Sequence, residues 1–113
     1  MRETVRTVLV TLAAAALGAT VLAAGRPNPN RGKSLYKANC KVCHVKGGGA
    51  SVLTPLTKTQ VQWQRAFKTG IAGCLKRVEA KTGTALTPQD LQGMELYLVS
   101  HAADSDQPET CGQ

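Results

Sequence analysis

The sequence predicts an all-α fold of three to four helices, and three stretches support this prediction. Apolar residues recur at helical spacing over residues 31–43 and again over residues 59–69. A further helix begins after Thr87, where a proline takes the first helical position and Asp90 completes a capping box. A short segment over residues 71–78 is the fourth candidate helix.

Each long helix carries an apolar face that a small core needs. Gly32, Tyr36 and Cys40 follow one another at steps of four, and the glycine allows another helix to cross closely. Trp63 and Phe67 lie four apart on the second helix and are expected to pack in the core. The last helix has an apolar stripe of Leu91, Met94, Leu98 and Ala102.

The chain begins with the features of a secretory leader. Two arginines precede an apolar run from Val8 to Ala24, which ends in small residues. We expect residues 1–24 to be a signal peptide and residues 25–113 to be one periplasmic domain without stable membrane insertion. An uncleaved anchor is the alternative, although the run is short for a membrane span.

The stretch Cys40-Lys41-Val42-Cys43-His44 has the form Cys-x-x-Cys-His, which is the attachment signature of a c-type haem. Each cysteine forms a thioether with one haem vinyl group, and the histidine binds the iron on the proximal side. The sequence therefore predicts one covalent haem c held by Cys40, Cys43 and His44.

Two other interpretations of this motif are less consistent with its surroundings. A thioredoxin-like Cys-x-x-Cys belongs to a βαβ unit, whereas the flanks here are helical in pattern. A zinc site is awkward because Cys43 and His44 are adjacent and no second ligand pair follows at finger-like spacing.

The two other cysteines, Cys74 and Cys111, are expected to form a disulfide in an oxidising compartment. Closing a loop of that length would stabilise the domain by roughly 4 kcal/mol on the loop-entropy model. Two free thiols, or Cys74 as an unusual iron ligand, are the alternatives.

Charge is distributed unevenly along the exported domain. Two of the fourteen basic and one of the seven acidic residues lie in the leader, so twelve basic and six acidic residues remain, a net charge of +6. All twelve basic residues lie between Arg26 and Lys81. This basic part is expected to attract redox partners with acidic docking surfaces. Nucleic acid is not expected to bind, because the basic residues are scattered and no aromatic residues are interleaved with them.

With these helices around one Cys-x-x-Cys-His, the chain resembles the class I, cytochrome c-like fold over essentially the whole exported domain. The resemblance is carried by the spacing of Gly32, Tyr36 and Cys40, by Pro55 after the histidine, and by the Leu-Thr-Pro-x-Asp sequence that opens the last helix. More narrowly, residues 55–60 and the ending from His101 are similar to small single-haem periplasmic cytochromes of Geobacter-type metal-reducing bacteria.

The resemblance implies several site residues. The Pro55 carbonyl would accept a hydrogen bond from His44, which orients the ligand. Pro55, Trp63, Phe67 and Leu98 are expected to line the haem pocket.

The chain departs from the family at the sixth iron ligand, which is usually a methionine in the loop before the last helix. Residues 45–86 contain no methionine, and Met94 lies within the last helix. Met94 is the favoured sixth ligand, and His101 is its main alternative. A lysine from residues 68–81, or an open site, also stays possible.

The function expected from these features is single-electron transfer between redox partners of a respiratory or extracellular chain, with no substrate chemistry, by a monomer. A sensor or peroxidase-like enzyme with a pentacoordinate haem is the alternative.

Overall fold

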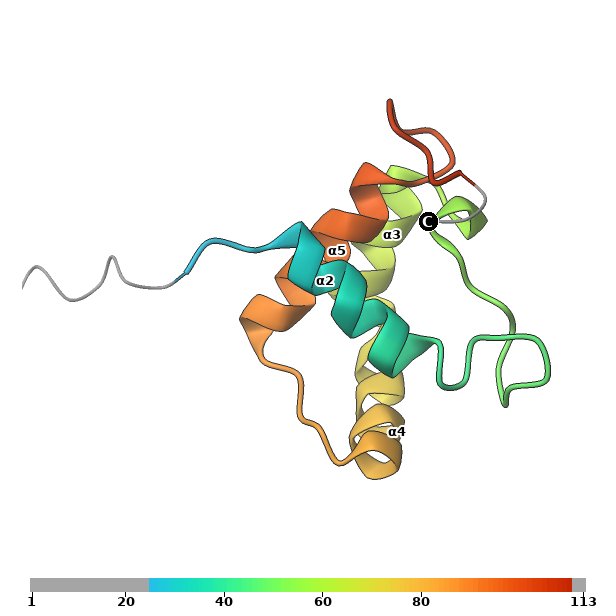
Figure 1. The fold of residues 1–113 in the computed structure, drawn as a ribbon, viewed down its shortest axis with the longest axis vertical. Coiled ribbons are helices and arrows are strands. Elements are labelled where there is room, and N and C mark those ends of the chain that lie inside the picture. The colour runs from blue at the N-terminus through green and yellow to red at the C-terminus, as the bar shows by residue number, and fades with distance from the viewer. Residues whose placement is uncertain (1–24, 111–113) are drawn as a thin grey trace, which may run out of the picture.

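A computed structural model describes residues 25–110 of the chain, and these residues form helices without any strand. In order, the elements are α2 (Pro29–Leu35), η3 (Tyr36–Cys40), η4 (Pro55–Thr57), α3 (Gln60–Arg65), η5 (Ala66–Gly70), α4 (Ala72–Thr82) and α5 (Pro88–Ser100) (Figure 1). The prediction of an all-α fold is therefore confirmed.

The signal peptide expected at residues 1–24 lies outside the described residues. Within residues 25–110, no helix has the length and apolar character needed to cross a membrane.

The first helix begins two residues earlier than the sequence indicates. The Asn28 side chain accepts hydrogen bonds from the backbone N–H groups of Asn30 and Arg31, at 3.0 and 3.2 Å. This N-cap, followed by a proline at the first helical position, starts α2 at Pro29. The helix then widens into the π-helical turn η3, in which the Lys41 N–H donates to the Tyr36 carbonyl at 3.2 Å.

The second helical stretch is also divided. Thr59 caps α3 in a reciprocal box with Gln62, as expected for a helix that starts there. A second π-helical turn, η5, carries the chain from Ala66 to Gly70. The next helix, α4, runs to Thr82, four residues beyond the expected end, and stops at Gly83 in the left-handed conformation with φ 71°.

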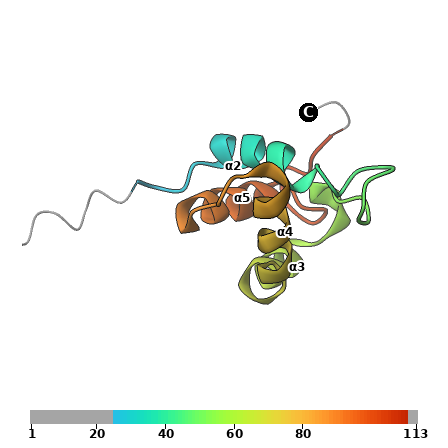
Figure 2. The same ribbon diagram turned by 90° about the horizontal axis from the view of Figure 1, so that it is seen from below.

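The crossing of α2 and α5 holds the two ends of the domain together (Figure 1), and Figure 2 shows α3 on the far side of α5 from α2. A Cβ on Gly32 would lie 2.0 Å from the Gly93 carbonyl oxygen. Only a residue without a side chain permits this backbone-to-backbone approach. Around the crossing lies the buried core of Tyr36, Trp63, Met94, Tyr97, Leu98 and Ala102.

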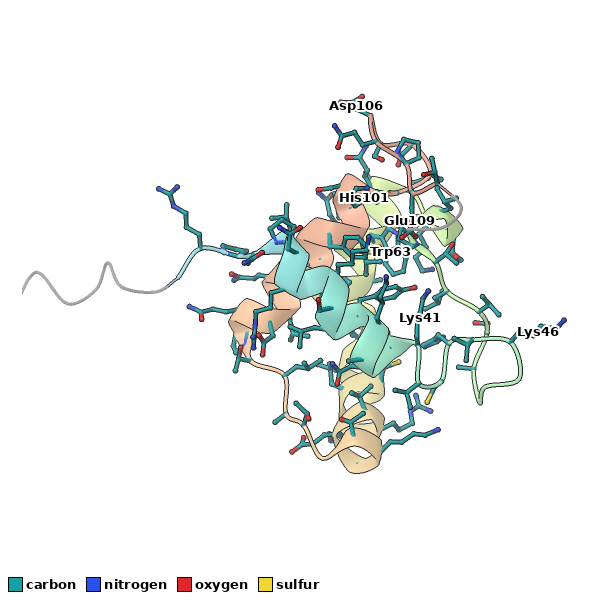
Figure 3. The ribbon with its side chains drawn as sticks, viewed as in Figure 1. Lys41, Lys46, Trp63, His101, Asp106 and Glu109 are labelled. Atoms are coloured by element: carbon teal, nitrogen blue, oxygen red, sulfur yellow. The ribbon has the colours of Figure 1, made fainter. Side chains whose placement is uncertain are left out.

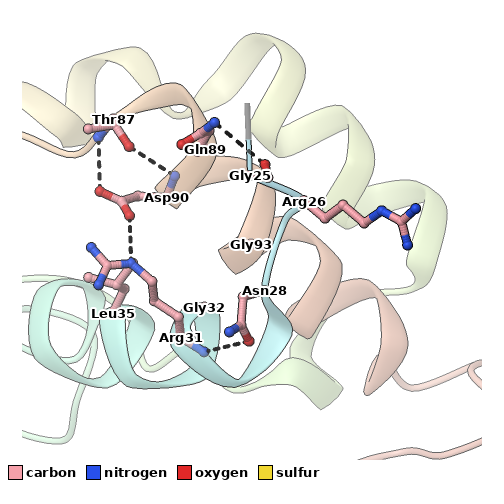
Figure 4. Close-up of a pocket in the computed structure, with 10 residues that line it drawn as sticks. All are labelled: Gly25, Arg26, Asn28, Arg31, Gly32, Leu35, Thr87, Gln89, Asp90 and Gly93. Carbon is pink, nitrogen blue, oxygen red and sulfur yellow. Dashed lines mark hydrogen bonds and ion pairs between the residues drawn. The ribbon is translucent and has the colours of Figure 1, made fainter. Parts of the chain in front are cut away.

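The start of α5 is tied to α2 through one carboxylate. Asp90 accepts from the Thr87 N–H at 3.2 Å and from Arg31 Nε at 3.0 Å (Figure 4). The Thr87 hydroxyl accepts in turn from the Asp90 N–H, so the capping box predicted from the sequence is confirmed. The hydrogen bond from the Thr87 backbone, assisted by Arg31, holds the pKa of Asp90 below its usual value.

The described part of the tail, residues 101–110, is held by hydrogen bonds to the helical body. Asp104 Oδ1 accepts from the Gln60 N–H at 2.7 Å, and the Ala103 N–H donates to the Lys58 carbonyl at 3.2 Å. The Tyr97 hydroxyl donates to Glu109 at 2.7 Å. Hydrogen bonds therefore hold this segment against residues 58–60 and against Tyr97.

Replacing Gly32 with alanine tests the helix crossing. The added Cβ must push α2 away from α5, so we expect Gly32→Ala to lower the free energy of unfolding by about 1–3 kcal/mol. Gly73→Ala is the matched control, because its Cβ would meet only an arginine side chain at 3.9 Å. The control is expected to be stabilised by about 0.5–1 kcal/mol, as alanine favours helix. Equal effects of the two substitutions in urea unfolding would contradict the close crossing.

The capping carboxylate makes a pH-dependent contribution to stability. Because the folded-state pKa of Asp90 is lowered, its contribution is fully present above the unfolded value of about 3.9 and is lost as the pH falls through the folded value. Asp90→Asn should therefore destabilise the protein at neutral pH, and the difference from the unsubstituted protein should shrink in acid. Urea unfolding from about pH 6 to pH 2 measures this. Arg31→Gln keeps the hydrogen bonds between Asp90 and Thr87, so it should reproduce only part of the destabilisation caused by Asp90→Asn.

Candidate functional site

The Cys-x-x-Cys-His motif lies at the wall of a large cavity. Cys40 ends η3, and its carbonyl accepts from the Cys43 and His44 N–H groups at 3.3 and 3.0 Å, which closes a tight turn. The cavity has a volume of about 700 Å³ and is mostly apolar. Its lining includes six of the residues expected at a haem site: Cys40, Cys43, His44, Trp63, Phe67 and Leu98.

The imidazole of His44 is oriented by the loop that follows it. Its Nδ1 lies 2.6 Å from the Ser51 carbonyl oxygen. A carbonyl oxygen can only accept, so Nδ1 carries the proton of the neutral ring and the lone pair of Nε2 is left for a metal. The loop returns through hydrogen bonds from Ala50 to Cys43 and from Leu53 to His44, at 3.2 and 3.3 Å.

The expected hydrogen bond from His44 to Pro55 is not formed, and Ser51 takes that role instead. The Pro55 carbonyl accepts from Trp63 Nε1 at 2.9 Å. Pro55 is fully buried but does not line the cavity. The proline therefore fixes the indole of Trp63, which is 4% exposed and forms part of the cavity wall.

Two ionisable groups of the wall have pKa values that are raised by burial. The Tyr36 hydroxyl donates to the Leu53 carbonyl, and burial raises the pKa of Tyr36 to about 12. Burial, together with the neighbouring Cys74, raises the pKa of the Cys40 thiol to about 11. Both groups therefore stay protonated at neutral pH in this setting.

Helix α4 contributes a face to the site, of which the sequence indicates only Cys74 and a lysine, as alternative iron ligands. Cys74, Arg77, Val78 and Lys81 all line the cavity. Their spacing of i, i+3, i+4 and i+7 is that of one helix face, and this was the signal available in the sequence. Lys81 Nζ lies 3.8 Å from Cys43 Sγ, so this face reaches the attachment motif itself.

Neither of the favoured sixth-ligand residues lines the cavity. Met94 is completely buried in the core around the α2–α5 crossing. His101 follows α5, where its Nδ1 lies 2.8 Å from the Gln107 carbonyl and its ring packs against Tyr97 with centroids 5.2 Å apart. Figure 3 shows His101 at the end of the molecule where the tail folds back, away from Lys41 within the motif. This placement does not support iron binding by either residue.

The predicted disulfide is also unsupported. Cys74 has a free thiol and lines the cavity, as do Cys40 and Cys43, which are free as well. Cys111 lies outside the described residues. Across residues 25–110, no disulfide is present.

The residues present fit a covalently attached haem. Two thiols and one oriented imidazole share a wall of the cavity, and its volume lies within the range of about 300–1,000 Å³ usual for small-molecule and cofactor sites. The apolar lining suits a flat aromatic macrocycle. The fold and the site together define a helical protein of the c-type cytochrome class.

Comparison with known families agrees with this class. The family model described as cytochrome c oxidase, cbb3-type, subunit III matches residues 27–98, which is more than half of the chain. The chain therefore belongs to this family of cytochrome c domains and is, in general terms, a haem-based electron carrier. Neither the curated proteins nor the solved structures gave a match.

The bond between Trp63 and Pro55 gives a test of the cavity wall. Trp63→Phe leaves the buried Pro55 carbonyl without its donor, so we expect a loss of about 1–3 kcal/mol in the free energy of unfolding. Val61→Ala on the same helix is the control, since Val61 is 59% exposed and should change stability by only about 0.5 kcal/mol. A Trp63→Phe variant as stable as the control in thermal unfolding would contradict the described wall.

Proposed function

We propose that this chain is an exported single-electron carrier with one c-type haem, attached through Cys40 and Cys43 and bound on its proximal side by His44. The observation that carries the proposal is the placement of all three side chains on one apolar cavity, with His44 already oriented by Ser51. When bound, the haem supplies a one-electron couple at the iron.

The chain's own residues attach, orient and shield this group. The thioethers prevent loss of the cofactor, which matters for a carrier working outside the cytoplasm. The Ser51 carbonyl fixes the tautomer and the orientation of the His44 ring, with Nε2 left to bind the iron. Trp63, Phe67 and Leu98 exclude water from the cavity, and a dry pocket keeps the reorganisation on electron transfer small.

The charge distribution supports partners with acidic docking surfaces. Lys58, Arg77 and Lys81 line the cavity, and Lys46 extends from the loop after His44 (Figure 3). Such a surface steers brief encounters with acidic redox proteins, and salt weakens this electrostatic attraction.

We propose that the protein is a periplasmic monomer that does not bind nucleic acid. The similarity to cytochromes of Geobacter-type bacteria suggests a role in extracellular electron exchange.

One observation favours the alternative of a pentacoordinate sensor or peroxidase-like enzyme. Among the described residues that line the cavity there is no methionine, and His44 is the one histidine. An iron bound by His44 alone would leave one side open to small molecules. Rapid binding of carbon monoxide to the reduced protein, without displacement of a ligand, would favour this alternative over the simple carrier.

The covalent attachment and the electron transfer are tested on protein matured with the bacterial export and haem-attachment apparatus. We expect acidified organic solvent to leave the haem on the unsubstituted chain and to extract any haem from a Cys40→Ala/Cys43→Ala variant. Stopped-flow reduction should be reversible and should slow at least tenfold as salt rises when the partner is acidic.

Charge reversal locates the docking surface. Lys41 lies within the attachment motif and Lys46 lies two residues after it, so Lys41→Glu and Lys46→Glu should each slow exchange with an acidic partner several-fold at low salt. Arg26→Glu changes the net charge equally, but Arg26 lies before the start of α2 and far along the chain from the motif, so it should have a smaller effect. A matured protein that lacks covalent haem, or that does not exchange electrons, would refute the proposed function.

A further inference from the structure

The cavity narrows the choice of a second iron ligand to side chains that were not favoured from the sequence. Besides His44 and the two attachment cysteines, Cys40 and Cys43, four described side chains on the cavity carry a donor atom able to bind iron: Tyr36, Lys58, Cys74 and Lys81. Met94 and His101 are not among them. From this set, and resting on the proposed haem site, we propose that Cys74 binds the haem iron through its thiolate sulfur as the second axial ligand.

The position of Cys74 suits this role. Its thiol is free, half-buried and on the cavity, and it lies near enough to Cys40 to affect the ionisation of that thiol. Cys40 and Cys43 are used for attachment, so Cys74 is the one thiol of the cavity that stays available. Cysteine thiolate is an established type of axial ligand to haem iron.

The competing donors are already engaged. The Tyr36 hydroxyl donates to the Leu53 carbonyl, and its buried position disfavours the phenolate that iron would need. Lys58 Nζ lies over the Trp63 ring, 5.8 Å from its centroid. Lys81 Nζ lies 3.8 Å from Cys43 Sγ, at the point of haem attachment.

The same helix face also balances the charge that ligation creates. On binding, Cys74 releases its proton to solvent and its sulfur donates an electron pair to the iron, whose oxidation state does not change. Arg77 and Lys81, one and two turns further along α4, line the same cavity and offset the negative charge of the thiolate.

Thiolate ligation would set the redox properties of the carrier. An anionic sulfur donates more electron density to the iron than a neutral methionine sulfur does, and it favours the oxidised form. The carrier would then have a lower reduction potential than a methionine-ligated one and would accept electrons only from strongly reducing partners.

Spectroscopy of the haem-loaded protein tests the ligand directly. We expect the oxidised, unsubstituted protein to be low-spin, with the g-values and charge-transfer absorption of a thiolate–histidine haem. Cys74→Ala should lose this signature and become high-spin or bind carbon monoxide rapidly when reduced. Cys74→Met should restore a low-spin iron with a clearly higher potential and a methionine-to-iron charge-transfer band. Cys74→Ser provides a second replacement should the alanine variant fail to fold.

Matched variants separate Cys74 from the other candidates. Met94→Leu, His101→Gln and Cys111→Ser should keep the thiolate signature. Lys81→Arg, which keeps the positive charge at the cavity, should keep it as well. An unsubstituted protein without the signature, or a Cys74→Ala spectrum identical to it, would overturn the inference while leaving a covalent haem in place. Absence of covalent haem from every variant would instead refute the proposed function.

Discussion

The close approach of α2 and α5 at Gly32 is the constraint on which the rest of the domain depends. With a side chain at that position, the Gly93 carbonyl would be displaced and the two helices would separate. Because they touch, Tyr36 on the next turn packs against Tyr97, with ring centroids 5.9 Å apart, and both residues are almost fully buried. The following turn then delivers Cys40 to the cavity edge. A packing contact at one end of the helix therefore determines where the proposed attachment cysteine lies at the other.

The two π-helical turns adapt this helical frame to the cavity. Both η3 and η5 border it: η3 contributes Tyr36 and Cys40, and η5 contributes Phe67 and Gly70. A π-turn inserts extra backbone into a helix and changes which side chains face inward, and such turns are frequent at functional sites. The spacing of apolar residues in the sequence does not reveal these turns, because five or six residues are too few to distinguish the π-helical period from the α-helical period. The sequence therefore indicates the helices but not these departures.

The structural features that the sequence predicts correctly are those that depend on residues close together in the chain. The Thr87–Asp90 capping box and the start of the second helix near Thr59 depend on groups within four residues of one another, and both are recognisable in the chain. The partner of His44 depends on the path of a glycine-rich loop, which brings Ser51 rather than Pro55 to the ring. The anchoring of the tail by Asp104 on Gln60 joins residues 44 positions apart, and no local pattern encodes it. Tertiary contacts of this kind require the folded chain.

The location of Met94 shows why residue type alone is a poor guide to an iron ligand. A methionine sulfur is a good ligand, but the same flexible thioether also fills irregular gaps in a core, and Met94 is fully buried beside the crossing that orders the fold. Drawing it into the cavity would open a void in the core, at a cost of about 2–5 kcal/mol by analogy with deletion of a buried methionine side chain. Cys74 needs no such rearrangement, because α4 already presents its thiol to the cavity together with Arg77 and Lys81. The packing energy of the core and the charge of the cavity therefore both favour the proposed ligand, Cys74, over Met94.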